Sequence, residues 1–350
     1  MPIMDAEPTH RRIAWYKSPI SRAELAALNQ RSDWKGLLQT LGHLGLLVLT
    51  GAAAWYSVGR LPLLAVLALI YIHGMFFAFL VNAFHEFVHQ TVFKTKAINT
   101  FFLQLVSFVS WQNPVMFWAS HQEHHRYTLH PPEDMEVVLP QTVDLKCFLK
   151  LLVINPWDFY FRLRLVTRLA FGRLDTVWEK SLFPPSAVAE RASLYRWARI
   201  ILLGHILIVA VSLYLGWWML PVVLTLAPFY GGGLQFLCNG TQHAGLQDNV
   251  SDFRLCTRTF TVNPFVQFLY WHMNYHIEHH MYAAVPCYNL AKLHAAIEYD
   301  MPPHPHGLIA TWREILPILA RQKREPAYQF VAPLPSRGAA AGQAQTVPAA

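Results

Sequence analysis

The sequence predicts an all-α integral membrane protein with four transmembrane helices and a cytoplasmic helical cap that carries clustered histidines. Three observations lead to this fold class. Hydrophobic residues make up 54% of the 350 residues and charged residues only 14%, whereas a typical soluble domain has about 25% charged residues. Several uncharged stretches exceed the roughly 20 residues that a helix needs to cross a bilayer. Finally, the chain has 18 histidines, nearly as many as its 21 acidic residues.

The transmembrane helices are predicted from the runs that carry no Lys, Arg, Asp or Glu. Gly36–Gly59 and Leu61–Phe84 are two such runs, and only Arg60 separates them. Such a short connection predicts that these two helices form a hairpin. Ile200–Gln247 is the longest uncharged run, and it is long enough for the third and fourth helices with a break near Gly216.

The distribution of basic residues predicts the orientation of the chain. An even number of crossings puts both termini on one side, and every Lys and Arg except Arg60 lies on that side. The positive-inside rule makes that side cytoplasmic. The basic residues form no dense run, so a net charge of +7 predicts membrane anchoring and no nucleic-acid partner.

We therefore expect three parts. Residues 1–35 form a cytoplasmic N-terminal segment, residues 36–325 form the membrane domain, and residues 326–350, rich in Ala, Pro, Gln and Gly, form a disordered tail.

Three histidine motifs are the strongest functional signal. They are HEFVH, HQEHH and HIEHH, which contain His85 and His89; His121, His124 and His125; and His276, His279 and His280. At about 100° per residue, helix positions i, i+3 and i+4 share one face. Eight imidazoles exceed what one metal ion can bind, and they suit two ions with positions left open for a small molecule. Imidazole is a good ligand for iron, zinc, copper and nickel, so the residue type alone does not choose the metal. Glu123 and Glu278 point away from their own motifs and are expected to orient histidines of another motif.

The uncharged segment Ala97–Ala119 lies between the first and second motifs. If both motifs bind the same metal ions, this segment cannot cross the membrane. If it crossed the membrane, these two motifs would face opposite compartments. Its Asn, Gln and Pro residues permit another arrangement, so we interpret it as an in-plane or partly inserted helix.

The motif set HxxxH, HxxHH and HxxHH among four apolar spans resembles the membrane fatty acid desaturase and hydroxylase superfamily over roughly residues 36–295. The run NYHIEHHMYAAVPCYNLAKLH is similar to bacterial acyl-lipid desaturases, which implies a bacterial inner membrane location. NGTQH contains Asn239 and His243, which match an Asn-x₃-His element of stearoyl-type members. That match implies His243 as a ninth iron ligand and Asn239 as a residue that approaches one iron through water.

The resemblance implies two iron ions (Fe²⁺/Fe³⁺), O₂ as co-substrate, and electrons from a separate donor: a ferredoxin, a rubredoxin or a b-type cytochrome. The implied ligands are His85, His89, His121, His124, His125, His243, His276, His279 and His280. The implied substrate is a membrane lipid with a long, hydrophobic acyl chain. Its channel would run along the membrane helices, where Phe76, Phe77, Phe79, Phe229 and Phe236 are available.

Desaturation of the fatty acyl chain is the expected reaction, but the first motif leaves an alternative open. It has Glu86 where many desaturases have Asp, and it is one residue shorter than in stearoyl-type enzymes. Hydroxylation of an acyl, alkane or carotenoid-like substrate on the same scaffold is therefore the second hypothesis.

Two other classes of protein are less consistent with the motifs. HEFVH satisfies the HExxH pattern of an intramembrane zinc protease, but such a site leaves the other two motifs unexplained. A metal transporter would bind its ion near the bilayer midplane. Only His43, His73 and His205 lie within the predicted spans, and they form no cluster in the sequence.

Overall fold

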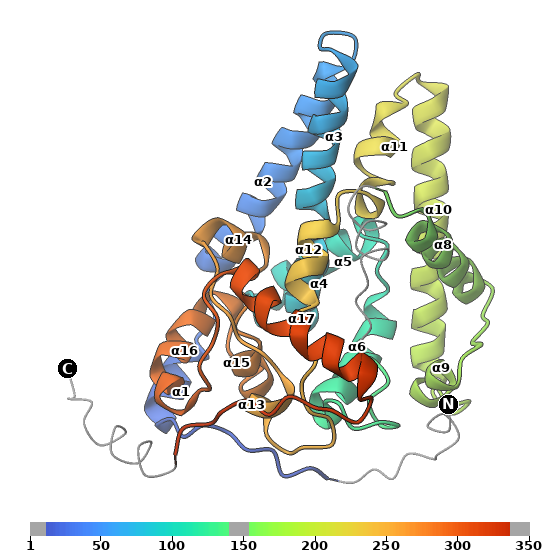
Figure 1. Cartoon of the computed structure of the whole chain (residues 1–350). Coiled ribbons are helices and arrows are strands. Elements are labelled where there is room, and N and C mark those ends of the chain that lie inside the picture. Colours follow the sequence, from blue (N-terminus) through green and yellow to red (C-terminus); the bar gives the residue numbers. More distant parts are fainter. Residues whose placement is uncertain (1–11, 140–153, 337–350) are drawn as a thin grey trace. The chain divides into compact units, whose positions relative to one another are not determined.

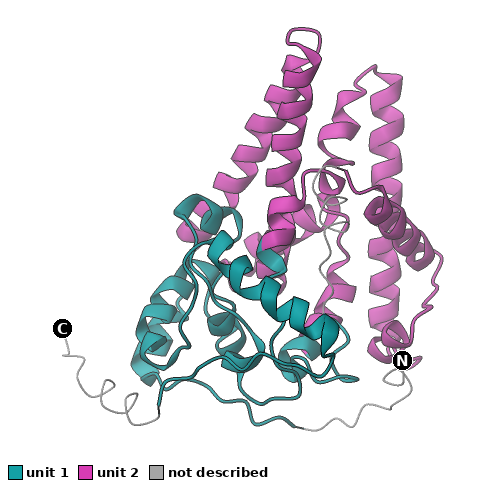
Figure 2. Cartoon of the chain, viewed as in Figure 1, with its two compact units in different colours: residues 1–32, 123–142, 238–350 teal, residues 33–122, 143–237 magenta. Residues whose placement is uncertain are grey.

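The computed structural model describes residues 12–139 and 154–336. These residues form helices and a few isolated β-bridges, and none of them belongs to a β-strand. The all-α prediction is confirmed. The chain divides into two compact units (Figure 2). Unit 1 comprises Met1–Ser32, Glu123–Thr142 and Cys238–Ala350, and unit 2 comprises Asp33–Gln122 and Val143–Leu237.

Unit 2 contains the long apolar helices (Figure 1). Its helices are α2 (Asp33–Ser57), α3 (Leu63–Ala78), α4 (Leu80–Val88), α5 (Lys96–Val109), α8 (Pro156–Ala170), α9 (Val177–Leu182), α10 (Val188–Tyr214), α11 (Met219–Val223) and η2 (Ala227–Phe229). Two further helices begin in unit 2 and end in unit 1: α6 (Pro114–Tyr127) and α12 (Gly233–Asn239).

Unit 1 consists of short helices joined by loops. They are α1 (Arg22–Leu28), α13 (Phe253–Cys256), α14 (Pro264–Leu269), α15 (His276–Met281), η3 (Cys287–Asn289), α16 (Leu290–Ile297), η4 (Glu298–Asp300) and α17 (Leu308–Arg324).

Three helical stretches of the described residues are long and apolar enough to cross a membrane: Asp33–Ser57, Leu63–Val88 and Val188–Tyr214. The first two correspond to the predicted hairpin, in which α2 packs against α3. The third ends where the sequence predicts a break. Gly216 has a φ of +71°, and the backbone N–H of Trp217 donates to the carbonyl of Ser212 (2.7 Å). Glycine suits this helix end because it adopts positive φ without steric cost.

The fourth predicted span is not one continuous helix. Residues 219–239 form α11, η2 and α12 in succession. Pro228 has no backbone N–H with which to bond the carbonyl of Leu224, and its ring would clash with that carbonyl in a helix. The α11 helix accordingly ends before Leu224, and Gly231, with a φ of +71°, turns the chain again.

The ambiguous segment 97–119 does not form one spanning helix, as expected. It divides into α5 and α6, and α5 is too short to count among the candidate spans. Asn113 starts α6, since its side-chain oxygen accepts from the backbone N–H of Val115 (3.1 Å) and Met116 (3.3 Å). Pro114 follows at the first helical position, which is favourable for proline.

A buried arginine organises unit 1 around α13. Arg254 donates to Asp252 and to Asp300, each at 2.7 Å, and its guanidinium lies 4.0 Å from the ring centroid of Tyr16. These contacts join the N-terminal segment, α13 and η4, and they fix the backbone next to Cys256.

Part of the predicted tail is described. The backbone N–H of Phe330 donates to the carbonyl of Gly245 (3.1 Å), and Gln329 donates to Asp248 (2.6 Å). Residues 337–350, the rest of the predicted tail, lie outside the described residues.

Two helical glycines of unit 2 provide a matched test of how closely its helices pack. A Cβ atom on Gly74 would lie 2.1 Å from the Tyr230 ring and 2.6 Å from the Tyr230 carbonyl oxygen, whereas a Cβ on Gly45 would have no atom within 4 Å. We expect Gly74→Ala to destabilise the protein by about 1–3 kcal/mol through overpacking. Gly45→Ala should be neutral or stabilising by up to about 1 kcal/mol, because alanine favours the helix. Thermal unfolding of the two variants in detergent measures this difference, and equal midpoints would contradict it.

Candidate metal centre

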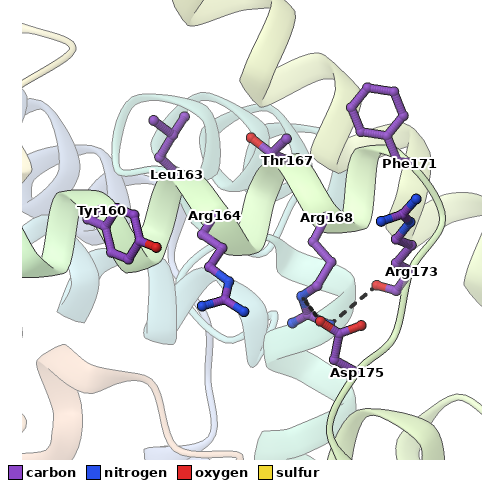
Figure 3. Close-up of a pocket in the computed structure, with 8 residues that line it drawn as sticks. All are labelled: Tyr160, Leu163, Arg164, Thr167, Arg168, Phe171, Arg173 and Asp175. Carbon is purple, nitrogen blue, oxygen red and sulfur yellow. Dashed lines mark hydrogen bonds and ion pairs between the residues drawn. The ribbon is translucent and has the colours of Figure 1, made fainter.

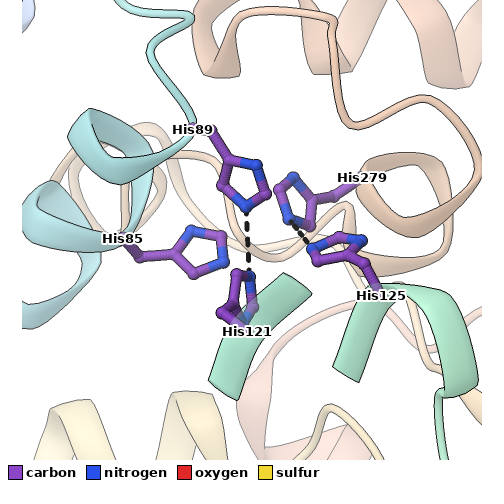
Figure 4. A group of neighbouring side chains, drawn as sticks. All are labelled: His85, His89, His121, His125 and His279. Carbon is purple, nitrogen blue, oxygen red and sulfur yellow. Dashed lines mark hydrogen bonds between the residues drawn. The ribbon is translucent and has the colours of Figure 1, made fainter. Parts of the chain in front are cut away.

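The first motif lies at the end of α4 in unit 2. His85 is in the last turn of α4 and His89 caps it, so the two rings lie on one face with centroids 4.8 Å apart. His121, from the unit 2 part of α6, joins them: its Nε2 lies 3.1 Å from the Nε2 of His89, and its ring centroid lies 4.5 Å from that of His85. Figure 4 draws these three side chains.

Four histidines of unit 1 form a second, fully buried set. His124, His243, His276 and His280 each offer one ring nitrogen, and these nitrogens all lie within 4.8 Å of one another. The Nε2 of His276 is 3.1 Å from the Nε2 of both His243 and His280.

The remaining two predicted ligands also meet in unit 1. His125 comes from α6 and His279 from α15, and their Nε2 atoms lie 3.2 Å apart (Figure 4). The sequence-predicted histidines are therefore gathered, within the units, as a set of three, a set of four and a pair.

The separations of the ring nitrogens fit metal ligation. A metal–nitrogen bond of about 2.0–2.1 Å puts neighbouring ligand nitrogens roughly 3 Å apart when they subtend a right angle at the ion. Burial, followed by the effect of nearby His124, lowers the pKa of His243 to about 3, and burial also lowers the pKa of His280 well below its usual value. Both rings are thus neutral, which is the form that binds metal. These clusters could hold metal ions.

In several of these rings the other nitrogen has a partner that orients the ring. The Nδ1–H of His243 donates to the carbonyl of Cys256 (2.9 Å), and the Nδ1 of His280 lies 3.2 Å from the hydroxyl of Thr128. In unit 2, the Nδ1 of His85 lies 3.1 Å from the carboxylate of Glu86. Such partners fix the tautomer so that Nε2 faces the metal.

Asp134 is the most important residue that the sequence analysis missed. Its carboxylate is fully buried and accepts from the Nδ1 of His124 (2.8 Å) and from the backbone N–H of Leu129 (2.8 Å) and Glu136 (2.9 Å). Burial alone would raise the pKa of Asp134, but the charge of His124 and these hydrogen bonds lower it. Asp134 lies in a loop. In a loop, the number of residues between an acid and a histidine motif does not predict whether the two side chains meet.

The glutamates of the second and third motifs have other partners than expected. Glu123 pairs with Arg126 at 3.0 Å on the surface of α6. Glu278 is buried and accepts from the hydroxyl of Thr259 (2.6 Å) and from the Nδ1 of His294 in α16. Because position i+2 of α15 points away from the motif, Glu278 meets the neighbouring helix and not a ligand histidine. Asn239 ends α12, four residues before His243, and its role stays a prediction.

An apolar pocket of about 670 Å³ lies within unit 2, among α2, α3, α5 and α11. Phe77, one of the predicted channel residues, lines it together with His73 and Leu80.

Apolar helices of spanning length and converging histidines define an integral membrane protein with histidine clusters that could hold metal. The profile of the fatty acid desaturase family matches residues 60–312, which contain all three histidine motifs, and the chain belongs to that family. No curated protein matches the chain. Membership implies an oxidoreductase with a lipid substrate. The match also accounts for the motifs that a protease site leaves unexplained.

The role of Asp134 can be separated from that of Glu123, a surface acid within the second motif. We expect Asp134→Asn to weaken metal binding by about 10–100-fold, because it removes the charged partner of a ligand histidine. Glu123→Gln, which only breaks an exposed ion pair, should leave the affinity unchanged. Competition with a chromophoric chelator measures both affinities. Unchanged binding in Asp134→Asn would show that Asp134 does not position a ligand.

Proposed function

We propose that this protein is an O₂-dependent di-iron oxidoreductase that introduces a double bond into a long-chain fatty acyl lipid. The observation that carries the proposal is the buried set of four histidines, whose Nε2 atoms face one another at 3.1 Å along His243, His276 and His280. Family membership over residues 60–312 supports the reaction class.

The second ion would use the remaining five histidines. We propose that His85, His89 and His121 of unit 2 act together with His125 and His279 of unit 1. The continuity of α6 supports this, because His121 and His125 are four residues apart on one helix and therefore lie about 40° apart around its axis. Asn239, as a water-mediated neighbour of one iron, is part of the proposal.

Two iron ions bound there would supply the redox chemistry by which O₂ oxidises an unactivated C–H bond. The protein's own contribution is to hold the ligand rings and exclude water. Asp134 and the Cys256 carbonyl hold the rings of His124 and His243 in one tautomer. The burial of the four-histidine set keeps bulk water from the reacting carbon.

The apolar pocket of unit 2 suits the acyl chain. It lies on the same helical stretch as the first motif, since Phe77 and Leu80 line it and His85 follows within α4. A rise of about 1.5 Å per residue puts His85 less than about 10 Å beyond Leu80 along the helix axis. A substrate tail in the pocket would thus lead toward the first motif.

The proposal includes a membrane topology. Residues 219–239 would form the fourth crossing as a broken span, which membranes tolerate where the irregular backbone is buried in protein. Gly231 fits this, because a Cβ there would lie 2.5 Å from the Met75 backbone nitrogen. The helical cap and both termini would be cytoplasmic in a bacterial inner membrane. A separate ferredoxin, rubredoxin or b-type cytochrome would deliver electrons there.

Metal analysis tests the di-iron centre. We expect two iron ions per chain in the purified protein, and about one in His280→Ala, since this change removes a nitrogen from the four-histidine set. His306→Ala is the control and should retain both ions, because its exposed ring contacts Thr261 and His304, neither of which is a predicted ligand. Elemental mass spectrometry gives the ratios. A single zinc ion per chain would instead support the protease hypothesis.

The reaction is tested by expression in a host with a simple lipid profile, followed by mass spectrometry of its acyl chains. Desaturation predicts a new product that is lighter by two hydrogen atoms, whereas hydroxylation predicts one that is heavier by an oxygen atom. His276→Ala should abolish the product, and His306→Ala should not. A product that persists in His276→Ala would exclude the proposed centre as its source. Purified enzyme with NAD(P)H and O₂ alone should be inactive until an electron carrier is added.

A further inference from the structure

Unit 2 has a second pocket, of about 600 Å³, on α8 and the loop that follows it. Figure 3 shows its lining, in which Arg164 and Arg168 extend from the same side of α8, one turn apart. Arg173, Tyr160 and Phe171 contribute to the same pocket. The family assignment does not account for this group of side chains.

Only one of the three arginines is neutralised. Arg168 pairs with Glu179 and with Asp175, the latter at 3.3 Å. Arg164 and Arg173 are exposed, and among the described residues neither guanidinium forms an ion pair with an acidic side chain. The three arginines lie near two carboxylates, those of Asp175 and Glu179, so the group carries a net charge of +1. That charge predicts a ligand with negative charge.

The surroundings of these charges are unusually apolar for a water-exposed surface. Trp157 is 58% exposed, Phe161 57% and Phe171 74%. Exposed aromatic residues next to arginines on a helix are typical of a surface that lies in the membrane interface. An acidic soluble protein would match the charges but would leave these rings in water.

The contacts of α8 with α10 join the end of α8 to the part of α10 where the charged residues end. Arg199 in α10 donates to the carbonyl of Ala170 at the end of α8 (2.8 Å). Leu169 and Ala170 pack in one cluster with Ala198 and Ile201. Arg199 is the last charged residue before the apolar part of α10, which continues without Lys, Arg, Asp or Glu to Tyr214. The end of α8 thus lies where α10 passes from polar to apolar surroundings.

We propose that this pocket binds the phosphate of an anionic membrane phospholipid. Arg164 and Arg173 donate hydrogen bonds to the phosphate oxygens, which match the fork of a guanidinium. Phe171 and Tyr160 contact the glycerol and the first carbons of the acyl chains. The bound lipid holds α8 against the membrane surface beside α10.

Lipid titration followed by native mass spectrometry tests the site, with the full chain in neutral detergent. The two probes are phosphatidylglycerol and phosphatidylcholine, which carry the same acyl chains and differ in net charge. We expect the unmodified protein to bind phosphatidylglycerol more tightly. The double variant Arg164→Gln/Arg173→Gln should bind it about 30-fold more weakly, given about 1 kcal/mol for each basic residue near an anionic lipid and tenfold for each 1.4 kcal/mol.

Two further variants control for folding and for net charge. Arg164→Lys/Arg173→Lys keeps both charges and should retain most of the affinity. Arg22→Gln/Arg31→Gln removes two exposed charges from unit 1 and should leave the affinity unchanged. Equal weakening by this control pair would overturn the site, because it would show a nonspecific charge effect.

Two other results would also overturn the proposal. Inorganic phosphate that displaces the lipid at equal concentration would mean that the pocket binds free phosphate and not a membrane lipid. An acidic ferredoxin whose binding is lost in Arg164→Gln/Arg173→Gln, while phosphatidylglycerol binding is kept, would mean that the pocket is a protein docking surface.

Discussion

A buried imidazole has two ring nitrogens, and both need partners in an interior that excludes water. The four-histidine set of unit 1 meets this requirement in an asymmetric way. Asp134, Cys256 and Thr128 occupy the Nδ1 side of three rings, and the Nε2 atoms turn toward one another. Hydrogen bonds among these rings cannot satisfy all of these nitrogens, because the Nε2 atoms of His243 and His280 are then both acceptors. A cation at their centre satisfies them together, so ion binding and the folding of unit 1 are expected to be coupled.

The sequence predicted which histidines lie close together because its signal is local, whereas their role as iron ligands stays a prediction. Motifs of the form HxxHH place their rings on one helix face wherever the helix lies, and α6 and α15 carry them in this way. The partners of those rings were not predictable, because they come from segments without periodicity. Asp134 reaches His124 from a loop, and the Cys256 carbonyl belongs to the end of the four-residue helix α13. Glu278 contacts His294 because α16 packs against α15, and hydropathy contains no information about that packing.

Hydropathy predicted where the apolar helices lie, but it did not predict where the fourth one breaks. It located the hairpin and the end of α10 at Gly216, where the residue type itself is a signal. It treated residues 219–239 as one helix, because a hydropathy value describes the polarity of a proline and not its missing backbone N–H. Pro228 and Gly231 each act on the backbone, so the broken course of α11, η2 and α12 follows from backbone chemistry that an average over side chains does not register.

The histidines come from segments that are distant in the chain, and this has an energetic consequence. His125 and His279 are 154 residues apart, yet their ring nitrogens nearly touch. In the unfolded chain such a pair would meet rarely, and closing a loop of that size costs about 5 kcal/mol by the chain-entropy estimate used for cross-links. Hydrophobic packing of small helices such as α13 and α15 is a weak source of compensation, because each buries only one or two turns. Ligation of an ion by both histidines would offset this cost, since it would connect α6 with α15. In unit 1 such a link would add to the ion pairs of Arg254 and to the packing of buried side chains such as Tyr270 and Trp271.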